Sequence, residues 1–326
     1  PLSPVSEGQA ASGDQFVVTR KKFGEHTVRV DQGDEIWLVS ARDVQQPECG
    51  PCNFHQLKCS RLHGGGFIPT ELSSLTTAHQ LDQTKSTVIY VHGNRTDLEY
   101  AKSRALQTYE ILFQHRELMQ RGCRPPIRLV IFAWRSESEL PRMAPDFKRK
   151  SERSYGLAPV FAHLLSQFSD RRMLLLGYSL GGQIALRGVP LPQANDTKPG
   201  RYEVALIAPS LTQSYIDCEL PQVPFNATIA KTTVFVNRND RAIRIARFLL
   251  RTKTRFEPSP LERIASQTQC TAVNPVEIVD ITNEVSRCHS IIKYASDSQL
   301  IQCGILEITE RLQAGRPQAE VGHPKP

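Results

Sequence analysis

A serine in this sequence lies in a pattern that can expose a reactive hydroxyl group. Ser179 is the central residue of Gly177-Tyr178-Ser179-Leu180-Gly181, which fits G-x-S-x-G. A short apolar run precedes the pattern and a helix-forming run follows it, as in a nucleophile elbow. Glycine suits both flanking positions, because a Cβ atom beside such a strained turn would clash with the neighbouring strand or helix. The N-terminus of the following helix would also favour negative charge near the serine.

A serine hydroxyl is a weak nucleophile until a base takes its proton, and the base needs an acid that fixes its tautomer. Asp240 follows a predicted strand at 232–237, and His289 follows a predicted strand at 276–281. In an open parallel sheet, sites lie at the C-terminal ends of the strands. We therefore expect Ser179, Asp240 and His289 to meet there as nucleophile, acid and base.

Each of these residues also has a plainer interpretation. The glycines around Ser179 fit an ordinary turn, and His289 fits a polar loop. Asp240 fits the N-cap of a helix at 241–250, since aspartate is a preferred cap, and we expect it to serve as both cap and acid. The rival acids are Asp217, Asp280 and Asp297.

The loop His92-Gly93-Asn94 follows a predicted strand at 87–91, two strands before the serine. A loop in this position can donate a backbone N–H to the oxyanion that forms during acyl transfer. We expect the N–H groups of Asn94 and Leu180 to form this oxyanion hole. The His92 side chain is expected to have a structural role.

The elements that must position these residues alternate along the chain. Two strands are predicted at 15–19 and 35–40, and the later strands at 87–91, 128–134, 173–176, 202–207, 232–237 and 276–281. Helices are predicted at 96–120, 147–168 and 241–250. Strands alternating with helices predict an α/β fold with a mostly parallel sheet covered by helices on both faces. We expect a single domain at 15–312, a flexible leader at 1–14 and a disordered tail at 313–326.

Residues 42–83 are predicted as an irregular, cysteine-containing insertion or loop region. Cys49 and Cys52 match a redox C-x-x-C motif, but no βαβ unit surrounds them. Zinc binding by the cysteines of this region with His55 or His63 lacks a second paired spacing. Local disulfide bonding is therefore the favoured use of Cys49, Cys52 and Cys59.

Composition suggests a location and restricts the partners. The chain has eight cysteines, an even number, and starts at Pro1. Both facts favour an exported protein, periplasmic or extracellular, with some disulfides, while a cytoplasmic location stays open. No run of 18 apolar residues predicts a transmembrane helix.

The net charge of +7 includes an arginine stripe on the predicted helix at 241–250. Such a stripe is usually a solvated face, and the alternative is attraction to anionic substrates or surfaces. No nucleic-acid-binding motif accompanies it. The oligomeric state is left open.

Several segments resemble the serine esterase and lipase superfamily of α/β-hydrolases, and above all a bacterial α/β-hydrolase family of unknown function. They are residues 39–42, 88–94, 132–136, 177–181, 207–209, 236–242 and 280–290, so the resemblance runs from about Ile36 to Ala295. Tyr178 departs from it, because many relatives carry histidine before the serine. The resemblance implies an α/β-hydrolase fold and a serine hydrolase, and it implies no particular substrate.

The reaction expected from these observations is hydrolysis of a carboxylic ester, small or lipid-like, through an acyl-enzyme on Ser179. It needs no metal or organic cofactor. Arg238 and Arg241 are expected to help keep Asp240 ionised, and residues 135–150 to border the pocket. The alternatives are acyl transfer to an acceptor other than water, which uses the same triad, and a non-catalytic binding protein on this fold.

Overall fold

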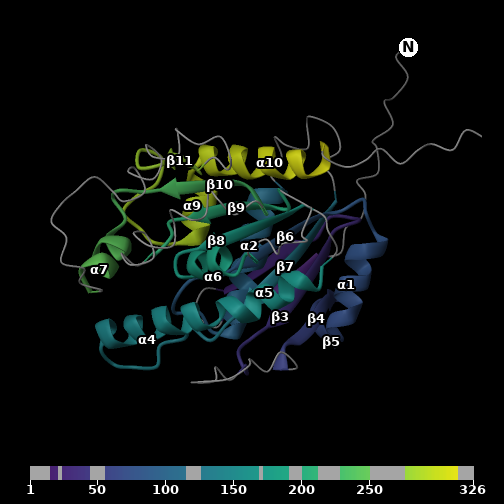
Figure 1. Ribbon diagram of the computed structural model, residues 1–326, viewed down its shortest axis with the longest axis horizontal. Helices are drawn as coiled ribbons and strands as arrows, with labels where there is room; N and C mark the ends of the chain where they lie inside the picture. The colour runs from purple at the N-terminus through teal and green to yellow at the C-terminus, as the bar shows by residue number, and fades with distance from the viewer. Residues whose placement is uncertain are drawn as a thin grey trace, which may run out of the picture.

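The computed structural model describes residues 15–20, 24–44, 56–114, 126–168, 172–190, 200–211, 228–249 and 276–314. Its centre is a nine-stranded sheet in the order β11-β10-β9-β8-β6-β7-β3-β4-β5 (Figure 1). The strands of this sheet are β3 Glu35–Ser40, β4 Lys58–His63, β5 Gly66–Thr70, β6 Ser86–Val91, β7 Ile127–Ala133, β8 Met173–Tyr178, β9 Tyr202–Ile207, β10 Ile229–Val236 and β11 Val276–Asp280. A separate antiparallel pair joins β1 Gln15–Arg20 to β2 Gly24–Arg29.

The sheet is parallel from β11 through to β3, and its last two pairs, β3–β4 and β4–β5, are antiparallel, so that β4 alone of the described strands of this sheet runs in the opposite direction. Every residue of β6, β7, β8 and β9 is buried. Strands buried on both faces need apolar residues throughout, which explains continuous runs such as Leu174-Leu175-Leu176. The predicted α/β fold is confirmed.

Helices cover both faces of the sheet (Figure 1). They are α1 Leu72–Leu81, α2 Leu98–Phe113, α4 Met143–Gly156, α5 Ala158–Ser166, α6 Gly181–Arg187, α7 Arg241–Leu249, α9 Ile291–Asp297 and α10 Gln299–Ala314. One hydrophobic core joins the sheet to α1, α4, α5 and α6, with Phe161 among its members. The other joins it to α2, α9 and α10, with Tyr294 among its members. The two cores fix both sides of the strands that carry the site.

Residues 56–83 correct the prediction of an irregular region. They form the hairpin β4–β5, which extends the sheet beyond β3, followed by α1. Gly64 and Gly65 make the hairpin turn with φ values of 56° and 95°, a conformation that favours glycine. The sequence does not predict these strands, because β4 carries the polar residues Lys58, Ser60 and Arg61 and β5 contains Gly66 and Pro69.

Two predicted helices have other bounds in the structure, and two further helices were not predicted. The helix predicted at 96–120 begins at Leu98, capped by Asp97, and ends at Phe113. The helix predicted at 147–168 is two helices, α4 and α5, because Pro159 in the first turn of α5 has no N–H to continue α4. Helices α9 and α10 were not predicted, and the predicted tail overlaps the end of α10 at residues 313–314.

The cysteines of the described residues are unpaired. Cys59, on β4, is buried, whereas Cys288 and Cys303 are exposed. The expectation that Cys59 forms a local disulfide is therefore wrong, because its side chain faces the sheet core as a small apolar group. The other cysteines, the leader at 1–14 and residues 315–326 of the tail lie outside the described residues. In the same described part, no helix has both the length and the hydropathy to cross a membrane.

Candidate active site

The turn between β8 and α6 has the geometry of a strained elbow. Ser179 has a φ of 53°, which is unusual for a residue with a side chain. A Cβ on Gly181 would lie 2.3 Å from the Val91 carbonyl oxygen, and one on Gly177 would lie 2.7 Å from the Cα of Gly182. Both glycines are required, because β6 and α6 approach the turn too closely for any side chain.

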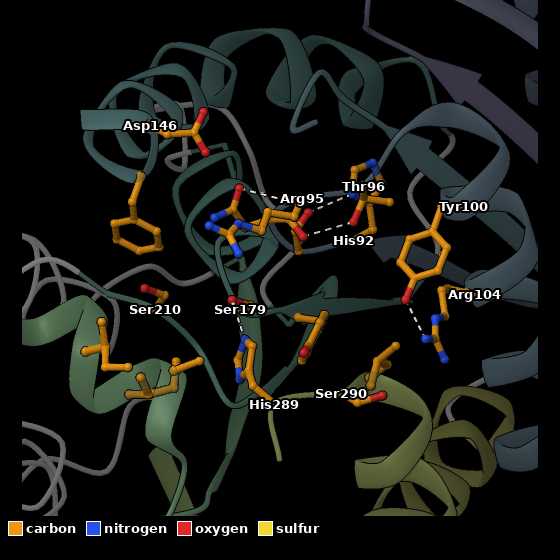
Figure 2. Close-up of a pocket in the computed structure, with 18 of the residues that line it drawn as sticks. His92, Arg95, Thr96, Tyr100, Arg104, Asp146, Ser179, Ser210, His289 and Ser290 are labelled. Atoms are coloured by element: carbon orange, nitrogen blue, oxygen red, sulfur yellow. Dashed lines mark hydrogen bonds between the residues drawn. The ribbon is translucent and has the colours of Figure 1, made fainter. Parts of the chain in front are cut away.

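The three residues predicted to meet at the strand ends do so. The Nε2 of His289 lies 2.9 Å from the Oγ of Ser179, as Figure 2 shows. The Nδ1 of His289 lies 2.5 Å from Oδ2 of Asp240. Asp240 follows β10 and His289 follows β11, at the same edge of the sheet as the turn after β8. The result is one hydrogen-bonded chain from hydroxyl to imidazole to carboxylate.

Asp240 is held on both of its oxygens. Oδ1 accepts hydrogen bonds from the N–H groups of Ala242 and Ile243 at 2.8 and 3.1 Å, so the carboxylate also caps the first turn of α7. Oδ2 accepts hydrogen bonds from His289 and from the hydroxyl of Tyr294. Burial alone would raise the pKa of Asp240, but these hydrogen bonds, with His289 first, outweigh burial and lower it.

Two expectations around Asp240 need correction or limits. Arg238 was expected to help keep it ionised, and its guanidinium forms an ion pair with the rival acid Asp280 at 2.8 Å. The contacts that lower the pKa of Asp240 most are those with His289, Tyr294 and the Ile243 N–H, and neither Arg238 nor Arg241 is among them. Of the remaining rivals, Asp297 pairs with a lysine on its own helix, and residue 217 lies outside the described residues.

Tyr178 packs against the face of the His289 imidazole. Its ring stacks on the imidazole of His289, with centroids 5.1 Å apart and planes 26° apart. Tyr294 meets the same imidazole edge-on at 6.3 Å. Between these two rings the imidazole has little freedom to turn away from Ser179. Tyr178, at which this chain departs from the family it resembles, therefore helps to hold His289 in place.

The predicted oxyanion loop is held through the peptide that joins Gly93 to Asn94. The Gly93 carbonyl accepts hydrogen bonds from the Oγ of Ser136 at 3.0 Å and from Nδ1 of His92 at 2.9 Å. In a trans peptide the N–H points away from the C=O, so the Asn94 N–H points away from both donors. No peptide of the described chain is cis. A Cβ on Gly93 would lie 3.0 Å from that of Ser179, so this peptide passes directly beside the serine.

His92 is a structural residue in this arrangement. Its Nε2 accepts the backbone N–H of Trp134 at 3.1 Å, and its own carbonyl accepts the indole N–H of Trp134 at 2.8 Å. Burial lowers the pKa of His92 to about 4. The neutral imidazole thus links the ends of β6 and β7 and keeps Nδ1–H available for the Gly93 carbonyl.

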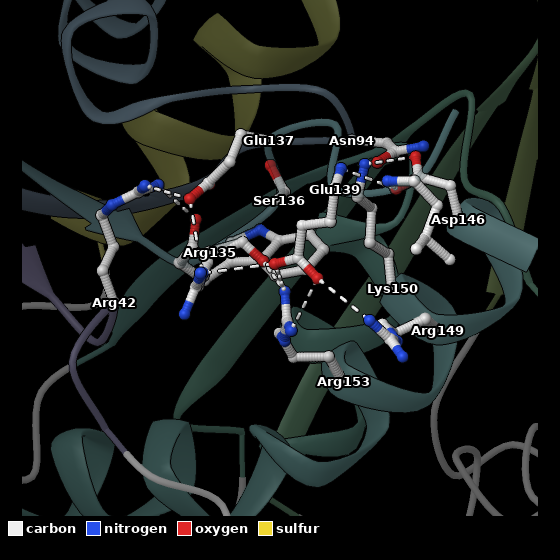
Figure 3. Close-up of polar contacts among 12 residues, drawn as sticks. Arg42, Asn94, Arg135, Ser136, Glu137, Glu139, Asp146, Arg149, Lys150 and Arg153 are labelled. Atoms are coloured by element: carbon white, nitrogen blue, oxygen red, sulfur yellow. Dashed lines mark hydrogen bonds and ion pairs between the residues drawn. The ribbon is translucent and has the colours of Figure 1, made fainter. Parts of the chain in front are cut away.

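The segment between β7 and α4 is held by a network of charges, drawn in Figure 3. Lys150 and Asp146 are both buried and lie 2.6 Å apart. The other Asp146 oxygen accepts the N–H groups of Glu139 and Leu140. The Glu139 carboxylate binds Arg153 through two nitrogens, at 2.6 and 3.1 Å. These bonds hold residues 135–142 in place, and of the stretch 135–150 that was expected to border the pocket, Met143, Asp146 and Phe147 line it.

Ser179 opens onto a pocket of about 400 Å³. Its apolar lining includes Met143, Phe147, Ile243, Ile245 and Ile291, and its polar lining includes Asn94, Arg95, Thr96, Tyr100, Arg104 and Ser290. In Figure 2, Asp146 and Ser210 lie on one side of Ser179, and Tyr100 and Arg104 on the other. The hydroxyl therefore lies between the α4 side of the pocket, where Met143 and Phe147 are apolar, and the α2 side, where Tyr100 and Arg104 are polar; we call these sides its apolar and polar halves.

Sequence reasoning assigned no individual role to Ser136 or Tyr294. Ser136 lies within a segment that carried the family resemblance, which was a usable signal. Tyr294 lies on α9, a helix that was not predicted, and its contact with Asp240 depends on how α9 packs against the end of β10. Only the folded chain brings that pair together.

The comparisons with solved structures return distant hydrolases. A hyperthermophilic esterase from Pyrobaculum calidifontis is 12% identical, with a TM-score of 0.36, over 79% of this chain and 81% of that one. A siderophore hydrolase from Aspergillus nidulans is 11% identical, with a TM-score of 0.38, over 98% and 100%. Thermogutta terrifontis esterase 2 is 13% identical, with a TM-score of 0.34, over 73% and 86%.

No curated protein matches the sequence. Residues 70–308 match a family described as "Alpha/beta hydrolase of unknown function (DUF900)". That match spans most of the 326 residues, including the elbow, the two oxyanion-hole candidates, Asp240 and His289. The chain belongs to this family of α/β hydrolases of unknown function.

Proposed function

We propose that this protein is a serine hydrolase that cleaves carboxylic esters through an acyl-enzyme on Ser179. The observation that carries the proposal is the continuous chain of hydrogen bonds from the Ser179 hydroxyl through His289 to Asp240. Membership of an α/β-hydrolase family supports it. A serine with no catalytic role would not need a histidine that links its hydroxyl to a buried carboxylate.

In the proposed first step, the Ser179 Oγ attacks the ester carbonyl carbon while Nε2 of His289 takes the hydroxyl proton. Asp240 stabilises the imidazolium that forms. The carbonyl oxygen becomes an oxyanion and accepts hydrogen bonds from the Asn94 and Leu180 N–H groups. Within the described residues neither N–H donates to another group, which leaves both available.

The tetrahedral intermediate then collapses. The bond to the alcohol oxygen breaks, and His289 returns its proton to that oxygen, so the alcohol leaves neutral. A water molecule attacks the acyl-Ser179 ester with His289 again as base, releasing the acid and restoring the hydroxyl. Because Ser179 is 3% exposed, substrate must enter through the pocket.

A fluorophosphonate probe tests the proposal directly. Such probes phosphonylate a serine only when a neighbouring base activates it. We expect labelling of the wild-type chain and none of Ser179→Ala, with Ser210→Ala as the matched control because Ser210 lines the same pocket without a histidine contact. Absence of labelling in a folded wild type would contradict the proposal. Product analysis with added alcohols then separates hydrolysis from acyl transfer.

Export of the protein remains a proposal, as do disulfides among the cysteines outside the described residues. Thiol titration under denaturing conditions, with and without reductant, tests them. We expect more titratable thiols after reduction, and eight thiols without reductant would contradict the prediction.

A further inference from the structure

The polar half of the pocket contains a guanidinium group that is held in place by a neutral partner. Arg104, on α2, donates a hydrogen bond to the Tyr100 hydroxyl and lies over the Tyr100 ring, 4.7 Å from its centroid. Both residues lie one helical turn apart and line the pocket. The tyrosine orients the arginine and leaves its positive charge uncompensated, since a phenol is neutral at physiological pH.

A second arginine lines the same pocket from the oxyanion loop. Arg95 has a φ of 57°, and its N–H donates to the Ser136 carbonyl at 2.7 Å. Its N–H also contacts the Asn94 side-chain oxygen at 2.8 Å. These bonds fix the backbone from which the side chain departs, and in Figure 2 that side chain extends over the pocket. Arg95 is exposed, so its charge acts at the entrance.

The acids of this region do not neutralise these arginines. Among the described residues, no ion pair joins Arg95 or Arg104 to a carboxylate, and the Arg104 guanidinium donates to Tyr100. Asp146 lines the pocket, but its oxygens are taken by Lys150 and by two backbone N–H groups. Asp240 is buried behind His289. The described pocket lining is therefore positively charged beside the reactive serine.

We propose that the polar half of the pocket binds an anionic oxygen group, carboxylate or phosphate, carried by the ester substrate, with Arg104 as its direct partner. Arg95 adds attraction at the entrance. The proposal rests on the proposed function and adds a substrate class to it. A half-buried guanidinium presents a planar pair of donors that matches such an anion, whereas a neutral ester leaves that charge without a partner.

The apolar half of the pocket then receives the uncharged end of the substrate. Phe147 belongs to α4, whose Asp146 lies on the side of Ser179 away from Arg104 in Figure 2, and Ile243 belongs to α7, which contacts α4. The ester that fits both halves is an amphipathic molecule with its scissile bond between a charged end and an apolar end. The protein should therefore prefer esters that carry a negative charge at one end over neutral esters of the same shape.

Matched ester pairs test the preference in the wild-type protein. One pair is 4-acetoxybenzoate and its methyl ester, which differ in a single charge on the leaving group. The second is 4-nitrophenyl hydrogen adipate and its methyl ester, with the charge on the acyl side. 4-Acetoxyphenyl phosphate separates phosphate from carboxylate. We expect kcat/KM to favour the anionic member of at least one pair by about tenfold or more, and this ratio to fall with added salt.

Variants assign the preference to its residues. Arg104→Gln should lower the anionic-to-neutral ratio of kcat/KM by about 10- to 100-fold, mostly through KM, as for loss of a charged hydrogen bond. Arg104→Lys should retain part of the ratio. Arg95→Gln should lower it by about two- to fivefold, because its charge is solvent-exposed. Lys148→Gln is the control, since its side chain is 74% exposed on α4 and carries the same charge.

The outcomes distinguish this inference from the proposed function. Equal or better turnover of the neutral member in both pairs, or an unchanged ratio in Arg104→Gln, would overturn the anionic substrate class. If neutral esters are then still hydrolysed and Ser179→Ala abolishes this, the proposed function stands alone. A ratio lowered equally by Lys148→Gln would assign the preference to net charge and overturn the role of Arg104.

Discussion

The Asp240 carboxylate combines two tasks that are usually described separately. One oxygen caps α7 and the other receives His289 and Tyr294. The sequence alone showed that both roles were open to this residue, because it follows a strand and precedes a helix. It could not show Tyr294, whose hydroxyl adds a third kind of contact to the same carboxylate.

Replacing Asp240 by asparagine separates the two tasks. The amide oxygen of Asp240→Asn can still accept the Ala242 and Ile243 N–H groups, so the fold should be retained. The amide NH₂ would face Nδ1 of His289 and favour the tautomer that carries its proton on Nε2. Turnover of a neutral ester should fall by about 10⁴-fold, as in a known triad.

The matched control for this change is Asp280→Asn, which removes the same charge from the end of β11 and should leave turnover near normal. Steady-state kinetics and circular dichroism of both variants provide the measurement. Near-normal turnover in Asp240→Asn would move the acid role to Asp280 or Asp217.

Removing the Tyr294 hydroxyl tests the third contact. Tyr294→Phe keeps the buried ring but loses one donor to Asp240, so the pKa of Asp240 should rise. We expect kcat/KM to fall by about tenfold, in the range for a hydrogen bond to a charged group. The loss should grow toward acid pH. Tyr155→Phe, at a tyrosine that is 56% exposed, should behave as wild type. A wild-type pH profile in Tyr294→Phe would show that the contact is dispensable.

At the scale of elements, the strands were predicted better than their connections. Short apolar runs such as Leu174-Leu175-Leu176 indicate buried strands. Their ends, and the polar residues that follow them, could therefore be predicted from the sequence. The prediction of one continuous helix at 147–168 was wrong, although Pro159 in the sequence indicates a break. The hairpin at residues 58–70 has no apolar run, and its place in the sheet depends on pairing with β3.

Helix α4 also carries a buried charge pair that no local pattern distinguished from an exposed i, i+4 pair. Asp146→Asn would leave the buried Lys150 ammonium without a carboxylate, which costs about 3–5 kcal/mol of the free energy of unfolding. Urea denaturation measures this loss. Adding Lys150→Met should recover part of it, because the unpaired charge is then gone. Glu152→Gln on the exposed face of α4 should change stability by less than about 0.5 kcal/mol. A similar small change in Asp146→Asn would contradict the importance of the pair.

At the scale of the whole molecule, stability should depend on pH through His92 first. Its pKa is lowered from 6.5 to about 4 in the folded state, so the unfolded chain binds more protons between these values. The stabilisation is therefore complete above about pH 6.5 and is lost as pH falls toward 4. This group can contribute up to about 1.4 kcal/mol per pH unit.

Below that window the carboxylates with lowered pKa values, including Asp240 and Asp146, should add to the loss as they are protonated. Denaturation at several pH values gives the slope, and NMR of the His92 imidazole gives its protonation. An imidazole that titrates near 6.5 in the folded protein would contradict the prediction.

The order of the sheet has a consequence for how copies of the chain behave when crowded together. Among the described strands, the outermost on one side is β5, which is five residues long and includes Pro69, a residue with no N–H to offer another strand. On the other side, β11 is equally short and carries Glu277 and Asp280. Short, charged or proline-bearing edge strands discourage edge-to-edge pairing between the sheets of two chains. The hairpin β4–β5 thus protects a strongly apolar parallel sheet from aggregation at the border where β3 would otherwise lie open.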